Sequence, residues 1–311
     1  MPLIQTAENI WTGRADSENL ERYFQRVICQ KNLPDPKPKY GFIGFASDTG
    51  IMRNQGRIGA KEGPNAIRKT LGKLACHLPH DVNFWDLGNI ICEQDLESAQ
   101  RELSQQVDLL LNNGVTPIVL GGGHETAFGH YLGISKNFLT EKIGIINFDA
   151  HLDLRSLLPK NLGTSGTPFW QIALDAKEKN RTFDYCCIGL QKTANTSSLL
   201  KRADDLDVKY FFADEVRNDI QVIKNNLIAF IKNVDVIYLT ICLDVFSQSV
   251  APGVSAPQPL GLMPEAIFPL LEIIRQQGRL VSFDIVELSP PYDKDGQTAA
   301  LAACLIDKVV A

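Results

Sequence analysis

At residues 143–154 the chain reads I-G-I-I-N-F-D-A-H-L-D-L, an apolar run followed by three polar residues at alternate positions: Asp149, His151 and Asp153. Alternate residues of an extended backbone share one face. The three side chains therefore converge on one point if the strand continues, or bends only gently, beyond residue 148. A metal site at a strand end requires such a cluster. The alternative is a strand that closes in an ordinary polar loop.

Apolar strand-like runs and helical segments alternate along the rest of the chain. Strands are expected at Tyr40–Ala46, Asn83–Ile91, Thr116–Leu120, Lys142–Phe148, Thr182–Leu190, Lys209–Phe212, Val236–Val245 and Leu280–Leu288. Helices are expected near residues 64–75, 96–113, 125–138, 195–205, 215–232, 264–277 and 297–310. Nearly continuous apolar strands that alternate with helices predict a parallel sheet covered on both faces. We therefore predict a three-layer αβα fold of the α/β class, with a central, mostly parallel sheet of about eight strands.

The chain is expected to form one catalytic domain, residues 1–311, because α/β folds of this length seldom split. Residues 1–39 are expected to be a helical extension packed on it. The basis is the helical spacing of Leu20, Tyr23, Phe24 and Val27 within Ser17–Gln30, ahead of a loop rich in lysine and proline.

Composition limits the partners. The chain has 44% hydrophobic and 22% charged residues and a formal charge of -5, which argues against nucleic acid or an acidic membrane and favours a small-molecule substrate. No apolar run reaches 18 residues, and the first ten residues lack the pattern of a signal peptide. The seven cysteines are scattered and mostly within apolar runs, as expected of reduced thiols. A cytoplasmic protein is therefore expected.

Polar residues follow other predicted strands as well. His124 ends V-L-G-G-G-H, Asp244 ends L-T-I-C-L-D, and Glu287 lies in V-S-F-D-I-V-E-L. In open parallel sheets, ligands bind outside the carboxyl ends of the strands. These residues and the D-A-H-L-D stretch are therefore expected at one edge of the sheet.

The candidate ligands have a definite chemistry. Three carboxylates, Asp149, Asp153 and Asp244, with two imidazoles, His124 and His151, suit Mn²⁺, and Fe²⁺, Co²⁺ or Zn²⁺ are possible substitutes. A single catalytic zinc usually takes only three protein ligands. Two metals about 3.5–4 Å apart would use the whole set. The reaction class is metal-assisted hydrolysis.

Five motifs, in order and spacing, resemble the signatures of the arginase/agmatinase/formimidoylglutamase (ureohydrolase) family. They are G-G-G-H at 121–124, D-A-H-L-D at 149–153, L-T-I-C-L-D-V-F at 239–246, A-P-G-V-S-A-P at 251–257 and D-I-V-E-L-S-P at 284–290. The resemblance spans about residues 40–310. The segments at 56–68, 165–169 and 251–257 look more like the formimidoylglutamase branch than like arginase or agmatinase.

The resemblance implies roles for individual residues. His124, Asp149 and Asp153 would hold a first Mn²⁺ and His151 and Asp244 a second, with Asp149 bridging. Glu287 would face the cationic amidine of the substrate. A metal-bridging hydroxide would hydrolyse N-formimidoyl-L-glutamate to L-glutamate and formamide, a step of histidine degradation. Relatives usually assemble as trimers or hexamers, so a homo-oligomer is expected.

The chain departs from the family pattern at three positions. Cys242 stands where a second bridging aspartate is usual; it is either a softer ligand that favours zinc or iron, or a small buried strand residue. Gly123 replaces an aspartate, so that something else must fix the tautomer of His124. Ser165 replaces a histidine thought to shuttle protons, so help to the leaving amine must come from metal-bound water or Asp153.

The glutamate end of such a substrate needs cationic or N–H donors. Arg57 is the favoured carboxylate reader, and Arg53 and Asn54 lie in the same loop. These arginines alternatively solvate the loop or pair across a subunit interface. Asn195 and Ser165 are further expected contacts, although for Asn195 turn capping is favoured at least as strongly.

Two other functions remain open from the sequence. One is a different amidine or guanidine hydrolase on the same scaffold, such as agmatinase, guanidinobutyrase or arginase. The other is a metal-depleted, non-catalytic relative that binds a ligand, which Cys242 and Gly123 make conceivable.

Overall fold

The computed structural model describes residues 3–6, 8–14 and 16–311, and ten strands of these residues form one sheet. The strands are β1 (Leu3–Ile4), β2 (Val27–Ile28), β3 (Tyr40–Ser47), β4 (Phe84–Cys92), β5 (Thr116–Gly121), β6 (Ile143–Phe148), β7 (Asp184–Leu190), β8 (Lys209–Phe212), β9 (Val236–Cys242) and β10 (Leu280–Val286). Their order is β1-β4-β3-β5-β10-β9-β6-β7-β8, and β2 also pairs with β4. Among the described strands, every neighbouring pair is parallel except β1–β4.

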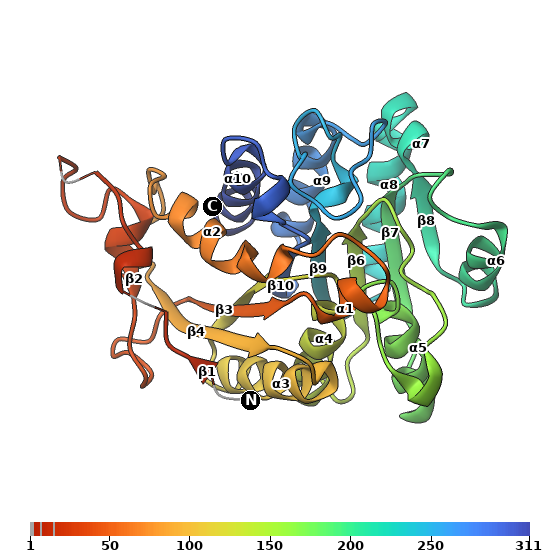
Figure 1. Cartoon of the computed structure of the whole chain (residues 1–311), viewed down its shortest axis with the longest axis horizontal. Helices are drawn as coiled ribbons and strands as arrows, with labels where there is room; N and C mark the ends of the chain where they lie inside the picture. Colours follow the sequence, from red (N-terminus) through yellow and green to blue (C-terminus); the bar gives the residue numbers. More distant parts are fainter. Residues whose placement is uncertain (1–2, 7, 15) are drawn as a thin grey trace.

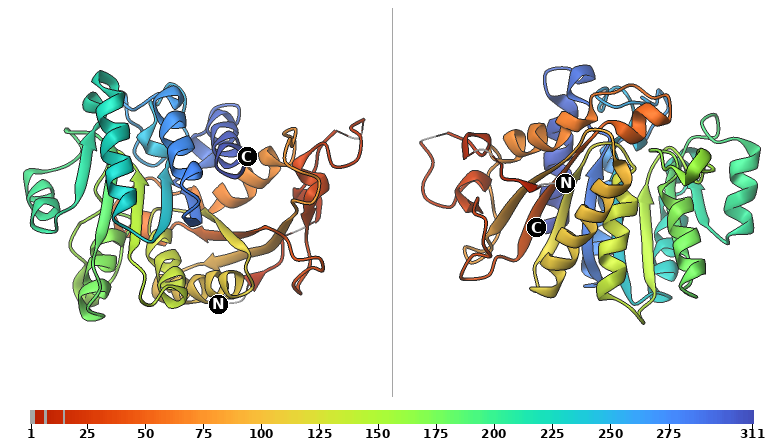
Figure 2. Two further views of the ribbon diagram at one scale, coloured as in Figure 1. Left: turned by 180° about the vertical axis from the view of Figure 1, so that it is seen from behind. Right: turned by 60° about the horizontal axis from the view of Figure 1, so that its bottom comes forward.

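Helices cover both faces of the sheet (Figure 1). They are α1 (Thr49–Arg53), α2 (Gly63–Leu71), α3 (Leu96–Asn112), α4 (Thr126–Asn137), α5 (Pro168–Glu178), α6 (Ser197–Asp205), α7 (Ala213–Asn218), α8 (Ile220–Lys232), α9 (Pro264–Gln276) and α10 (Gln297–Val310). One hydrophobic core joins the sheet to α2, α8, α9 and α10, and a second joins it to α3, α4, α5 and α6. Figure 2 shows these layers from two further sides. The predicted three-layer αβα fold is confirmed.

The central strands are buried on both faces, as their nearly continuous apolar sequences predicted. All eight predicted strands are present, and they form the parallel part of the sheet. The sheet has ten strands rather than about eight, because two-residue strands from the N-terminal region add to β4. Helices α1 and α5 were not predicted. None of the helices in the described part of the chain combines the length and the apolar composition that a membrane span requires.

The predicted helix at Ser17–Gln30 is wrong. This segment contains a short 3-10 turn, Tyr23–Arg26, and then β2. Leu20 has a left-handed backbone (φ +64°), which interrupts a helix, and the buried guanidinium of Arg26 donates to three backbone carbonyls, those of residues 20, 78 and 79. Helical spacing was misleading here because Tyr23 packs against Phe84 of β4, so tertiary contacts fix the conformation.

The strand order places the polar strand ends side by side. β5, β10, β9 and β6 are consecutive in the sheet and parallel, so the residues that follow them meet at one edge. The loop after β5 approaches the end of β3 so closely at this edge that position 122 requires glycine. A Cβ at Gly122 would lie 2.2 Å from the carbonyl oxygen of Ser47, at the end of β3. The G-G-G run thus lets the loop after β5 pack directly on its neighbour.

Candidate metal centre

Two groups of possible metal ligands meet at this edge and share Asp149. His124, Asp149 and Cys242 form one group, and Asp149, His151 and Asp244 form the other. Within each group the ligand atoms lie within 4.8 Å of one another. The structure therefore brings together the histidines, Cys242 and two of the aspartates predicted from the sequence, and it places Asp149 between the two groups.

His124 faces two carboxylates in the buried group. Its Nδ1 lies 2.9 Å from Oδ2 of Asp149 and 3.0 Å from Oδ2 of Asp153, so Asp153 also adjoins this group. Even so, among the described residues this buried nitrogen has no partner with hydrogen-bond geometry. A nitrogen held between two carboxylates without a proper hydrogen bond fits a cation shared by the three side chains.

His151 forms the corresponding contacts in the second group. Its Nδ1 lies 3.1 Å from Oδ2 of Asp244 and 3.4 Å from Oδ1 of Asp149. Asp149 thus turns one carboxylate oxygen to each histidine. This is the arrangement of a bridging ligand between two metal positions.

The charges of the cluster also fit divalent cations. Burial, followed by the charge of Asp149, raises the pKa of Asp153; burial likewise raises the pKa of Asp244 despite the opposing effect of His151. Burial opposes ionisation of Asp149 too, but the close approach of His124 and His151 outweighs burial and lowers the pKa of this carboxyl. Three carboxylates so close together and so deeply buried call for positive charge beside them. Divalent metal ions would supply it.

Cys242 lies at the end of β9 and is fully buried. Burial and the charges of Asp149 and Asp244 raise the pKa of its thiol well above the ordinary value. A thiolate at this position therefore requires a cation next to it. Whether Cys242 is a metal ligand or only a buried strand residue stays open. Its position beside His124 and Asp149 agrees with a ligand role.

The two residues predicted to be catalytic both have left-handed backbones, with φ +46° at Asp153 and +71° at Glu287. Such conformations cost about 1–3 kcal/mol for residues other than glycine and cluster at functional sites. The N–H of Glu287 donates to the carbonyl of Gly122, and its Oε1 accepts from the N–H of His124. The loops after β5 and β10 are thereby joined.

Thr240 fixes the tautomer of His124, for which the chain lacks the usual aspartate at position 123. Nε2 of His124 lies 3.0 Å from Oγ1 of Thr240, and that hydroxyl donates to Oδ1 of Asp284. Because the only hydroxyl proton is given to Asp284, Nε2 must be the donor to Thr240. The neutral ring then carries its lone pair on Nδ1, which faces the carboxylates. This tautomer is the one that can bind a metal through Nδ1.

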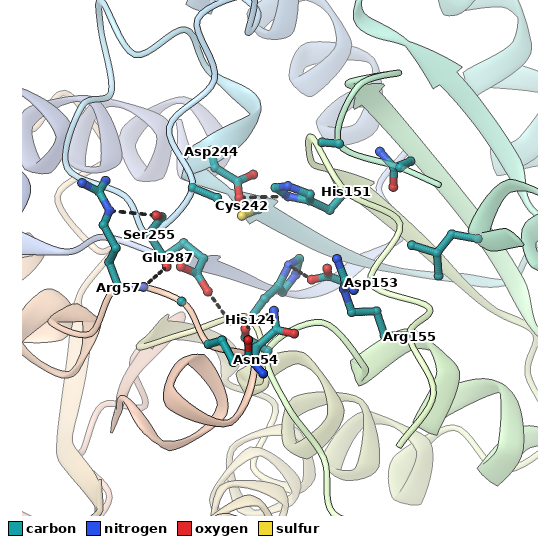
Figure 3. A pocket seen from close by; sticks show the side chains of 17 residues that line it. Asn54, Arg57, His124, His151, Asp153, Arg155, Cys242, Asp244, Ser255 and Glu287 are labelled. Carbon is teal, nitrogen blue, oxygen red and sulfur yellow. Dashed lines mark hydrogen bonds and ion pairs between the residues drawn. The ribbon is translucent and has the colours of Figure 1, made fainter. Parts of the chain in front are cut away.

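A pocket of about 330 Å³ opens at the sheet edge that carries the candidate metal ligands, called the metal edge below (Figure 3). Glu287 lines it, and among the described residues its buried Oε2 has no hydrogen-bond partner. Burial, followed by the charges of Asp244 and Glu125, raises the pKa of this carboxyl well above its ordinary value. A cationic group in the pocket would be stabilised beside it.

The predicted substrate contacts all line this pocket, but their side chains differ in availability. Arg57 donates to the carbonyls of Ser255 and Val254 and stacks on Tyr292, 4.1 Å from the ring centroid. The amide of Asn54 donates to Oγ of Ser165.

The amide of Asn195 is bound to backbone groups around the D-A-H-L-D stretch. Its Oδ1 accepts from the N–H of Leu152, and its Nδ2 donates to the carbonyls of Ala150 and Gln191. Asn195 therefore holds this loop in place.

Sequence reasoning missed Arg155, Thr240 and Glu125. Arg155 lines the pocket, and its guanidinium makes no hydrogen bond or ion pair among the described residues. A signal was present, because Arg155 continues the alternation of residues 149, 151 and 153. For Thr240 and Glu125 the signal was absent, since their contacts depend on which strands and loops are neighbours.

A buried group of carboxylates and imidazoles at the carboxyl edge of an αβα sheet is the arrangement expected of a metal-dependent hydrolase of the α/β class. The chain belongs to the arginase family, whose model matches residues 38–311. It is 49% identical over 306 residues to a formimidoylglutamase of Legionella pneumophila, covering 97% of this chain and 95% of the relative. It is 42% identical over 318 residues to that of Clostridium tetani, covering 97% and 94%.

A solved structure agrees with these relatives. The chain is similar to the crystal structure of Trypanosoma cruzi formiminoglutamase with Mn²⁺, at a TM-score of 0.83 and 25% identity. The match covers 93% of this chain and 97% of the other. The family predicted from the five sequence motifs is confirmed.

Proposed function

We propose that this chain hydrolyses N-formimidoyl-L-glutamate to L-glutamate and formamide. The observation that carries the proposal is the pocket itself, which offers an unpaired carboxylate oxygen of Glu287 at the metal edge and an unpaired guanidinium, that of Arg155. A substrate with a cationic amidine and two carboxylates complements this pair. The formimidoylglutamases that the chain resembles along nearly its full length support the same substrate.

The metal in this proposal is Mn²⁺, two ions per chain. His124, Asp149, Asp153 and Cys242 would hold one ion, and Asp149, His151 and Asp244 the other. When bound, the pair would lower the pKa of water to near neutrality and stabilise negative charge that develops on the substrate. The oxygen-rich ligand set supports manganese, whereas Cys242 adds affinity for softer ions.

Glu287 orients the amidine. Its Oε1 is fixed by the N–H of His124, so its Oε2 has a defined position in the pocket. Two N–H groups of the amidinium would donate to this carboxylate, a charge-assisted contact of the stronger kind. The carbon of the amidine is then held over the metal edge for attack by water.

Arg155 is proposed to receive the glutamate end, with Asn54 beside it. Unlike Arg57, Arg155 has no competing partner among the described residues, so binding a carboxylate would break no existing contact of its guanidinium. Arg57 shapes the pocket through the 251–257 loop. This assignment moves the predicted carboxylate reader from Arg57 to Arg155.

Asp153 is proposed to pass a proton to the leaving nitrogen. Its Oδ2 faces His124, whereas its Oδ1 makes no hydrogen bond among the described residues. Water adds to the amidine carbon, the bond from this carbon to the glutamate nitrogen breaks, and the nitrogen leaves as a protonated amine. Ser165 lines the pocket but is bound by Asn54.

The deciding experiment is a substrate panel with Mn²⁺ added. Formamide release from N-formimidoyl-L-glutamate should exceed urea release from arginine, agmatine or guanidinobutyrate by orders of magnitude. Preferential urea release would overturn the proposal in favour of a guanidine hydrolase. Well under one metal per chain after manganese loading, with no activity, would favour a non-catalytic relative.

A matched pair of variants tests the carboxylate reader. Arg155→Gln should raise KM for N-formimidoyl-L-glutamate far more than for an N-formimidoyl alkylamine without carboxylates, whereas Arg57→Gln should affect both alike. The opposite pattern would return the role to Arg57. A homo-oligomer and a cytoplasmic location complete the proposal; light scattering and cell fractionation test them.

A further inference from the structure

Glu125 follows the ligand His124 directly and is fully buried, yet the proposed reaction does not use it. Its Oε1 accepts hydrogen bonds from Oγ of Ser47, at 2.7 Å, and from the N–H of Gly50, at 3.0 Å. Its backbone carbonyl accepts from Nε2 of Gln100, at 2.7 Å. The side chain thus joins the loop after β5 to the start of α1.

Two glycines leave the space that this side chain fills. A Cβ at Gly123 would lie 2.1 Å from Oε2 of Glu125, and a Cβ at Gly50 would lie 2.3 Å from its Cδ. Neither distance is possible between real atoms, so both positions require glycine as long as Glu125 keeps its place. The carboxyl group is therefore enclosed between the ligand loop and α1.

Helix α1 leads directly into the pocket wall, because the residue that follows it, Asn54, lines the pocket. The carbonyl of Gly50 accepts from the N–H of Ser165, at 3.1 Å. Asn54, at the end of α1, donates to Oγ of Ser165, at 3.2 Å. A displacement of Gly50 would consequently move Asn54 and Ser165, which both line the pocket.

We propose that Glu125 is a positioning residue that holds α1, and with it Asn54 and Ser165, in register with the metal ligand His124. It contacts neither the ligand atoms nor the pocket. It acts through the two hydrogen bonds to Oε1 and through its volume. The inference deepens the proposed function, because it names what aligns the substrate wall with the metal edge.

If Glu125 acts through hydrogen bonds, a glutamine at position 125 should behave differently from what is expected if Glu125 acts through its negative charge. In Glu125→Gln the amide oxygen can accept from Ser47 and Gly50 and the shape is kept, so the conservative variant should rescue what Glu125→Ala loses. If Glu125 acted instead by placing negative charge near His124, the glutamine and alanine variants would be equally impaired.

The experiment compares wild type, Glu125→Gln and Glu125→Ala in the full chain. Glu125→Ala should raise KM for N-formimidoyl-L-glutamate about ten- to a hundredfold, the usual effect of misplaced contacts. Hydrogen exchange of residues 49–56 should become faster, while Mn²⁺ bound per chain stays at the wild-type value. Glu125→Gln should resemble wild type in all three measurements.

Two outcomes would overturn the proposal: equal impairment in both variants, or loss of Mn²⁺ from Glu125→Ala with unchanged exchange at residues 49–56. Metal binding and hydrogen exchange need no substrate, so they decide the inference even if wild type proves inactive on N-formimidoyl-L-glutamate. Should Glu125→Ala not fold, Ser47→Ala removes one of the two donors to Oε1. It should change the same measurements in the same direction, by less.

Discussion

The two halves of the candidate metal centre share Asp149 but differ in burial and in hydrogen-bonded support. The side chain of His124 is 1% exposed and that of His151 is 22% exposed. Nε2 of His124 is held by Thr240 and, through it, by Asp284, whereas Nε2 of His151 makes no hydrogen bond among the described residues.

The candidate centre thus has a fixed half, which contains His124, and an accessible half, which contains His151. The fixed half is organised before a metal arrives, because its imidazole has a set tautomer and orientation. The accessible half adjoins the pocket, where water and substrate arrive. We therefore expect the His124 half to bind metal more tightly and to release it more slowly than the His151 half.

The largest effect is expected from Asp149→Asn, because it changes both halves together. The amide keeps one oxygen and replaces the other with an N–H₂ group that cannot bind a metal. Metal content should fall well below two per chain, and kcat/KM should fall by more than about a hundredfold, beyond the usual cost of changing a residue that only supports a ligand. Elemental analysis and steady-state kinetics measure the two quantities.

Asp81→Asn is the control, since Asp81 is an exposed residue outside the pocket. It should match wild type in metal content and rate. Two tightly bound metals in Asp149→Asn would contradict the bridging role and, with it, the shared architecture of the two halves.

The next effect concerns the fixed half alone. Thr240→Val removes the hydroxyl that orients His124 and should weaken metal binding there about ten- to a hundredfold, leaving the other half unchanged. Thr240→Ser keeps the hydroxyl and should restore it. Calorimetric titration with Mn²⁺ would show one weakened and one unaltered site. Equal weakening of both sites would remove the distinction between the halves.

The D-A-H-L-D stretch and its partners were predictable because they depend on two general properties of chains. Apolar runs identify strands, and parallel strands point their carboxyl ends to one edge. His124, Asp149 and Asp244 follow from these rules alone. The implied roles of individual ligands came from the resemblance to a family, and they stay predictions.

The Thr240–Asp284 contact was not predictable for a physical reason. These residues lie directly opposite each other in the β9–β10 pair. Alternation of strands and helices along the chain does not determine that β10 lies between β5 and β9. Contacts across neighbouring strands therefore appear only once the order is known. The same limit applies to Glu125, whose partners are Ser47 at the end of β3 and Gly50 in α1.

A smaller effect is expected at Cys242. If this thiol is a ligand of the fixed half, Cys242→Asp should raise the affinity for Mn²⁺ relative to Zn²⁺ by about tenfold, since carboxylate is the harder ligand. Cobalt-loaded wild type should show thiolate-to-metal charge-transfer absorption that Cys242→Ser lacks. Metal content and spectra unaltered in both variants would identify Cys242 as a buried strand residue only.

The smallest effect is expected at Asn195, which supports the accessible half by hydrogen bonds to the backbone next to His151. Its amide makes three hydrogen bonds to backbone groups, two of them on either side of His151. Each such bond contributes about 0.5–1.5 kcal/mol. Asn195→Ala should therefore lower the free energy of unfolding by about 1.5–4.5 kcal/mol and weaken only the more weakly bound metal, by less than tenfold. Denaturant unfolding and Mn²⁺ titration measure these changes.

Asn195→Asp separates this supporting role from the substrate contact predicted from the sequence. The carboxylate can still accept from the N–H of Leu152 but cannot donate to the carbonyls of Ala150 and Gln191, so it should lose part of the stability and part of the metal affinity. A substrate contact would instead raise KM while leaving unfolding and metal titration at wild-type values. That result would make the accessible half independent of Asn195, and the exposure of His151 alone would then account for the weaker site.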